Sequence, residues 1–187
     1  MKIVIFDTET TGLLKPDNSP LEAQPKIIEF YGVAVNEDFE ILDEVNEFIY
    51  PGEPVSKEIT RITGIKDSDL KGKPEFGHFA ERINNLFKDA DLSVAHNIAF
   101  DNGMLEVEMK RLDMIRNLAV HDLCTVNHLL PIYGYRISLS ALYKKLFNTF
   151  FKAHRAKNDV FALITIFHKL IENGEIDLEL YKNGIQL

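Results

Sequence analysis

Asp7 and Glu9 are the first residues in the chain whose types and spacing could do chemistry. They stand two positions apart where the apolar run of residues 2–6 ends, so a strand there would turn both carboxylates to one face of a sheet. Two carboxylates so close repel each other unless a cation or a shared proton relieves the repulsion. A short pair of acids at a strand end is often only a solvated turn, so the pair needs partners to count as a site.

Three candidate partners stand downstream. Asp101 falls in the first turn of an expected helix, and Asp159 falls in the first turn of the last long one. His154 lies in the loop just before that helix. Each has a plain structural explanation, because acids in a first turn are favoured by the helix dipole and a lone histidine can be a surface residue.

Together, four carboxylates from three separated segments and one histidine form the ligand set that two hard divalent cations need. Sites of this kind clamp the attacking and leaving oxygens of an in-line phosphoryl displacement. Oxygen ligands favour Mg²⁺ or Mn²⁺. The conjunction therefore predicts two divalent cations, Mg²⁺ or Mn²⁺, held by Asp7, Glu9, Asp101 and Asp159.

The strands and helices that the sequence predicts must bring these residues together. Strand patterns cover residues 2–6, 27–35, 39–50 and 92–95. Helical patterns cover about 56–61, 75–88, 100–112, 122–130, 138–147 and 157–173. Asp122 is expected to cap the helix over 122–130, and Pro131 to end it. Strands followed by a helix–strand–helix alternation predict an α/β sandwich around a mixed sheet, and we expect one domain over residues 1–187.

The composition of the chain narrows the classes of protein to which it could belong. The 187 residues, 45 % of them hydrophobic and 27 % charged, suit one globular domain. No apolar run reaches the roughly 18–20 residues that span a bilayer, so no membrane association is expected. The single cysteine excludes an internal disulfide and fits a cytoplasmic location. A net charge of −8 disfavours a protein that coats nucleic acid non-specifically, but not an enzyme whose carboxylates face phosphate through cations.

Three segments resemble the exonuclease motifs of the DnaQ-like (DEDD) superfamily: Phe6–Gly12, His96–Asp101 and His154–Asp159. A histidine five residues before the last aspartate resembles the DEDDh branch, since the sister branch has a tyrosine four residues before it and this chain has Arg155 there. The branch includes the proofreading subunit of bacterial DNA polymerase III and oligoribonuclease. The resemblance spans nearly the whole chain and implies a ribonuclease H-like fold, with a mixed five-stranded sheet flanked by helices.

The resemblance also implies roles for the five residues. Asp7 would bridge both cations, and Glu9 and Asp159 would complete the site of the cation that binds the attacking water. Asp101 would serve the cation beside the leaving 3′ oxygen. His154 would be the general base, which suits a side chain whose unperturbed pKa of about 6.5 lies near working pH.

Substrate contacts are expected nearby. Backbone groups around the motif threonines would bind the terminal 3′ hydroxyl, and aromatic or apolar side chains would pack on the last nucleotides. For the two isoleucines core packing is an equally open reading, and for the arginine a solvated helix start is the alternative to a contact with the strand backbone. The candidates are Thr8, Thr10, Thr11, Ile62, Ile65, His96, Phe100 and Arg155.

The function that these features predict is a metal-dependent 3′→5′ exonuclease that releases nucleoside 5′-monophosphates from single-stranded DNA, in proofreading or repair. The expected partner is the 3′ end of a nucleic acid, with DNA favoured over RNA, and a DNA polymerase subunit is a further candidate partner. One alternative keeps the chemistry and makes the enzyme an exoribonuclease or oligoribonuclease. The other is a non-catalytic polymerase-associated module that binds nucleic acid, which the presence of all four carboxylates disfavours.

Overall fold

A computed structural model describes residues 1–182 of the chain. Over these residues it contains a five-stranded sheet with the strand order β3-β2-β1-β4-β5. The strands are β1 (Ile3–Thr10), β2 (Ile27–Val35), β3 (Ile41–Phe48), β4 (Leu92–Ala95) and β5 (His121–Cys124). β1–β2 and β2–β3 are antiparallel, whereas β1–β4 and β4–β5 are parallel. The predicted mixed five-stranded sheet is thereby confirmed. Residues 183–187 lie outside the described residues, so one domain over 1–187 stays a prediction.

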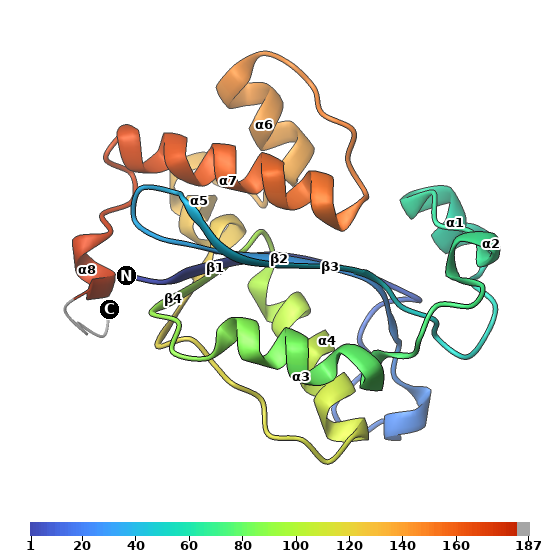
Figure 1. Cartoon of the computed structure of the whole chain (residues 1–187). Helices are drawn as coiled ribbons and strands as arrows, with labels where there is room; N and C mark the ends of the chain where they lie inside the picture. Colours follow the sequence, from blue (N-terminus) through green and yellow to red (C-terminus); the bar gives the residue numbers. More distant parts are fainter. Residues whose placement is uncertain (183–187) are drawn as a thin grey trace.

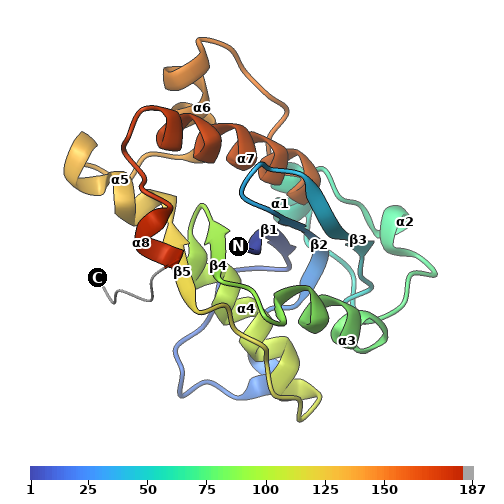
Figure 2. The ribbon, with the colours of Figure 1, turned by 60° about the vertical axis from the view of Figure 1, so that its left-hand side comes forward.

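Helices cover both faces of this sheet (Figure 1). One face carries α5 (Thr125–Tyr133), α6 (Leu139–Phe147) and α7 (Ala156–Glu172), and the other carries α3 (Phe76–Phe87) and α4 (Ile98–Arg111). Shorter elements are the 3₁₀ helix η1 (Leu21–Ala23) and the helices α1 (Lys57–Thr63), α2 (Asp67–Leu70) and α8 (Glu179–Lys182). In Figure 2, α8 lies beside β5. Within residues 1–182, no helix combines the length and apolarity needed to span a bilayer.

The alternation of side chains along β1 builds a core on each side of the sheet. Ile3 and Ile5 are fully buried in the cluster that contains the apolar face of α7. Val4 and Phe6 are fully buried in the cluster that contains α3 and α4. Because successive strand residues point to opposite faces, the side chains of the polar residues that follow on β1 also alternate between the α7 face and the α4 face of the sheet.

Several expected elements are confirmed. β2 and β4 have the expected bounds, and α3, α6 and α7 begin and end within about two residues of the expected helices, the usual uncertainty of helix ends. The hydroxyl of Ser138 caps α6 by accepting a hydrogen bond from the Ala141 backbone N–H at 3.3 Å. Gly174, with φ of +72°, follows the end of α7 in the left-handed conformation that the glycine permits.

The prediction for residues 122–130 is wrong at its start and its end. His121–Cys124 pairs with β4 as the edge strand β5, and α5 begins only at Thr125. Asp122 is therefore not a helix cap: its carboxylate accepts hydrogen bonds from the Ser93 hydroxyl and the Asn102 side-chain amide. Pro131 lies inside the last turn of α5 and does not end it. Pairing with a buried neighbour, which local patterns do not reveal, decided the conformation here.

Candidate active site

Asp7, Glu9 and Asp159 form a compact carboxylate cluster. Asp7 and Glu9 continue the stripe of Ile3 and Ile5 on β1 toward α7, and α7 brings Asp159 in its first turn. One carboxylate oxygen of each lies within 4.8 Å of the others. β1 runs on to Thr10, past the expected end at residue 6, so both acids are held inside a paired strand rather than in a turn.

Asp101 comes from the opposite face of the sheet. Thr8 points from β1 toward α4, and its backbone N–H and hydroxyl both donate to Asp101 Oδ1, at 3.1 and 2.8 Å. Asp101 is only 3 % exposed. It is not one of the three acids grouped within 4.8 Å, but it lines the same cavity. Thr8 therefore ties the fourth carboxylate to the strand that carries the first two.

The cavity that these acids share has a volume of about 520 Å³. His154 lies on its lining as an exposed residue with φ of +64°, a left-handed conformation that is uncommon for a non-glycine residue. The structure thus brings together all five residues predicted for the chemistry. The full lining is Asp7, Thr8, Glu9, His96, Asn97, Phe100, Asp101, Ser138, Leu139, Ser140, Ala153, His154 and Asp159.

Burial makes negative charge costly in this cavity. Burial, reinforced by the neighbouring carboxylates, raises the pKa of Asp7 well above its usual range and raises the pKa of Glu9 to about 8. Burial also raises the pKa of Asp101 to about 7 and that of Asp159 to about 6. Opposite charge nearby would reverse these shifts. The oxygen donors and their crowding therefore fit divalent cations.

We expect the metal-free protein to lose stability as pH rises. The folded protein keeps protons on these carboxylates that the unfolded chain releases near pH 4, so their contribution is complete below about pH 4. It is lost as pH rises through the folded values, up to about 8 for Glu9. Urea midpoints in EDTA should fall between about pH 5.5 and 8, and Mn²⁺ should restore stability at pH 8. A midpoint that rises over this interval in EDTA would contradict the assignment.

Several predicted substrate contacts are engaged within the protein. The backbone N–H and hydroxyl of Thr8 are used on Asp101. The N–H of Thr11 donates to the Lys26 carbonyl at 2.8 Å, and its hydroxyl accepts from the Lys26 N–H at 2.9 Å. The Thr10 hydroxyl donates to the Gly12 carbonyl at 2.7 Å. These groups hold the end of β1, so the N–H groups of Thr8 and Thr11 are already engaged, and binding of a 3′ hydroxyl by other backbone groups of residues 8–11 stays a prediction.

His96 lines the cavity but has both ring nitrogens engaged. Nδ1 lies 2.8 Å from the Thr125 hydroxyl and Nε2 lies 3.0 Å from the Ile137 carbonyl. Burial lowers the pKa of His96 to about 4, so the ring is neutral at working pH. It therefore holds the segment before α6 against β4, and His154 is the histidine whose ring is accessible for proton transfer.

Three further residues predicted to contact substrate differ in their exposure and in their contacts within the protein. Ile65 is 1 % exposed and packs with Ile28 and Leu70, so it is a core residue and presents no surface to a substrate. Ile62 is 42 % exposed, so its side chain is accessible for the predicted contact with the last nucleotides of a substrate. The Arg155 guanidinium binds the Glu29 carboxylate through Nε and Nη2, and its side chain stays 36 % exposed, so a contact with a strand backbone stays a prediction.

Phe100, Asn97 and the Ser138–Ser140 segment remain as accessible lining. Phe100 was expected there, whereas Asn97 and Ser138–Ser140 were not assigned a contact. Their signal in the sequence is their position: Asn97 lies inside the second motif, and Ser138 is the cap of the helix before the third. A polar residue beside a motif can equally be a local hydrogen-bonding group, so only the cavity lining identifies these residues.

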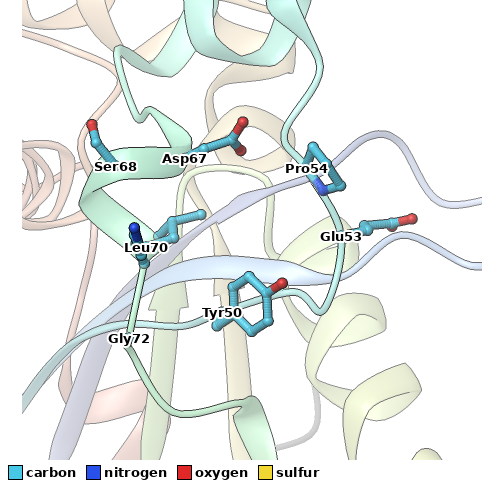
Figure 3. Close-up of a pocket in the computed structure, with 8 residues that line it drawn as sticks. Tyr50, Glu53, Pro54, Asp67, Ser68, Leu70 and Gly72 are labelled. Carbon is cyan, nitrogen blue, oxygen red and sulfur yellow. The ribbon is translucent and has the colours of Figure 1, made fainter.

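A second hollow of about 400 Å³ lies between the loop that follows β3 and the helix α2 (Figure 3). Tyr50, Glu53 and Asp67 are among its lining residues. Asp67 Oδ1 already accepts a hydrogen bond from the Val55 N–H at 2.7 Å. Among residues 1–182, the acids that lie close enough together to hold a metal ion line the carboxylate cavity and not this hollow.

Comparisons with known proteins identify the family of this chain. The family model RNase_T, described as exonuclease, matches residues 4–167. The PolC-type DNA polymerase III of Halalkalibacterium halodurans is 33 % identical over 176 residues, which are 92 % of this chain and 12 % of that protein. The protein of the same name from Listeria monocytogenes is 32 % identical over 173 residues, 91 % of this chain and 11 % of that protein. The chain thus spans about a tenth of the length of these relatives.

Solved structures share the fold. Exonuclease X in complex with 5′ overhanging duplex DNA is 22 % identical, with a TM-score of 0.67 over 97 % of this chain and 98 % of that one. The nuclease domain of 3′hExo, a DEDDh family member bound to rAMP, is 17 % identical, with a TM-score of 0.73 over 94 % of both chains. The predicted DnaQ-like DEDDh relationship and exonuclease class are confirmed. The chain belongs to the exonuclease family.

Proposed function

We propose that this exonuclease removes nucleotides one at a time from the 3′ end of single-stranded DNA, in proofreading or repair. The observation that carries the proposal is the grouping of Asp7, Glu9 and Asp159 within 4.8 Å beside an exposed histidine. They lie in a cavity of about 520 Å³, large enough for one nucleotide and its scissile phosphate.

Asp7, Glu9 and Asp159, together with Asp101, would hold two divalent cations, and we propose Mg²⁺ as the working ion. When bound, such cations lower the pKa of a coordinated water and stabilise the charge on the leaving oxygen. The residues' own contribution is to hold four oxygen donors in a buried cavity whose excess negative charge favours cation binding. Thr8 keeps Asp101 in place for this role.

His154 would accept the proton of the attacking water. It is exposed at the cavity, on the segment that leads into α7, whereas His96 is half-buried and hydrogen-bonded through both nitrogens. A general base must lie within hydrogen-bond reach of the proton that it removes, so the backbone conformation of His154 matters as much as its chemistry. Phe100 offers an aromatic face on which the terminal sugar or base could pack.

DNA is proposed over RNA because the curated relatives at 33 % and 32 % identity are named DNA polymerases. Contact with a polymerase subunit, or attachment to one in a longer chain, is proposed on the same ground. The alternative of an exoribonuclease is supported by a structural relative that is bound to rAMP and by one that recognises histone mRNA.

We expect the enzyme to trim a DNA oligomer faster than an RNA oligomer of the same sequence. Both would carry a 5′ label and be assayed in Mg²⁺ under identical conditions, with kcat/KM compared from initial rates. An Asp7→Asn variant purified in parallel controls for a contaminating nuclease. Faster trimming of RNA would overturn the substrate preference and favour the exoribonuclease, while degradation that persists in the variant would locate the activity elsewhere.

A further inference from the structure

We propose that Glu29 and Arg155 are a positioning pair that fixes the backbone around His154 relative to the carboxylate cluster. The proposal rests on the proposed function, because it assigns the pair's effect to the alignment of the general base. Neither residue would touch the reacting atoms. Both would act through the segment His154–Asp159, which carries the base and one of the three clustered acids.

Glu29 is a buried carboxylate behind the cluster. It lies on β2 directly opposite Glu9 of β1 and is 1 % exposed. Arg155 Nη2 donates to Oε1 at 3.1 Å, and Arg155 Nε lies 3.3 and 3.2 Å from the two oxygens. The Ala156 backbone N–H donates to Oε2 at 3.1 Å. A single buried carboxylate therefore binds both the side chain and the backbone of the two residues that follow His154.

The same segment is tied to the cluster from its other side. The Arg155 backbone N–H donates to Asp159 Oδ2 at 2.9 Å, and the Asp159 N–H donates to the Arg155 carbonyl at 2.9 Å. The guanidinium also lies 4.9 Å from the centre of the Phe48 ring. Arg155 is thus held through its side chain by β2 and β3 and through its backbone by Asp159.

These bonds explain how His154 keeps its φ of +64°. A left-handed conformation at a non-glycine residue persists when the surrounding structure over-determines it. The hydrogen bonds of the next two backbone N–H groups, to Asp159 and Glu29, supply that constraint. Arg155 offsets part of the charge of Glu29, since Glu29 raises the pKa of Glu9 and Arg155 lowers it.

The test is a double-mutant cycle between Glu29→Gln and His154→Ala, with kcat measured on single-stranded DNA in saturating Mg²⁺. Glu29→Gln alone should lower kcat by about 10- to 100-fold, since small misplacements of a catalytic group have effects of that order, with little change in KM. In the His154→Ala background the same change should alter kcat by less than about threefold, because the group that it aligns is gone. Effects that multiply would overturn the proposal.

A measurement that does not need activity keeps the two proposals apart. Amide hydrogen exchange should accelerate in Glu29→Gln over residues 154–159 and stay unchanged across β1 and β4. Arg155→Lys, which keeps the charge but loses the forked geometry, should accelerate the same segment less. Asp43→Asn, which breaks the exposed Arg82–Asp43 pair, is the matched control and should leave the exchange rates of residues 154–159 unchanged.

If wild-type protein cuts no DNA, the proposed function fails, and the exchange experiment still decides whether Glu29 and Arg155 fix the backbone of this segment. Unchanged exchange in Glu29→Gln would refute positioning.

Discussion

Asp7→Asn is expected to lower kcat on single-stranded DNA by about 10³-fold or more, because losing several kcal/mol of cation-mediated stabilisation has an effect of that size. Asparagine keeps the shape of the side chain but removes the charge at the centre of the cluster. The pKa of Asp7 is raised first by burial and then by the negative charges of its acidic neighbours, which are Asp101, Asp159, Glu9 and Glu29. Single-turnover rates in Mg²⁺ would measure the loss.

The same substitution should stabilise the metal-free protein at about pH 8, because it removes a charge that burial and four neighbouring acids disfavour. Urea midpoints in EDTA would measure that gain, and Mn²⁺ should stabilise the variant less than it stabilises wild type. Opposite movements of stability and activity separate a catalytic role from a structural one. A variant that is less stable, or that retains activity within about tenfold of wild type, contradicts the assignment of Asp7 as a metal ligand.

His154→Gln is expected to lower kcat by about 10²- to 10⁴-fold, the usual contribution of a general base. The substitution leaves the Asp7, Glu9 and Asp159 cluster intact, so stabilisation of the protein by Mn²⁺ should be retained. Rates and thermal shifts on the same preparations would test both statements. His168→Gln is the matched control, since His168 is exposed and paired with Glu172 on α7, and it should leave both unchanged. Loss of the Mn²⁺ shift in His154→Gln would make the histidine a ligand instead of a base.

The grouping of Asp7, Glu9, Asp101, His154 and Asp159 around one cavity could be predicted from the sequence because their spacing is tied to the elements that carry them. Alternation along β1 turns Asp7 and Glu9 to one face, and a first helical turn holds Asp159. The strand β5 could not be predicted in the same way. Its four residues have no distinctive pattern, and pairing with β4 determines their conformation.

Burial is the quantity that the sequence leaves open at the substrate positions. Ile62 and Ile65 are the same residue type three positions apart, yet one is exposed and the other lies in the core. Arg155 follows His154 in the chain and suggests a strand contact, but its guanidinium binds Glu29, which is distant in sequence. Tertiary packing determines the surroundings of both side chains, and local sequence does not specify that packing.

The most direct test of the account is to follow a 5′-labelled single-stranded DNA oligomer with wild-type protein in Mg²⁺ and in EDTA. In Mg²⁺ we expect labelled products that shorten one nucleotide at a time from the 3′ end, with release of nucleoside 5′-monophosphates, and in EDTA we expect no cleavage. Immediate release of the labelled 5′ nucleotide, internal cuts, or equal degradation in EDTA would contradict a metal-dependent 3′→5′ exonuclease.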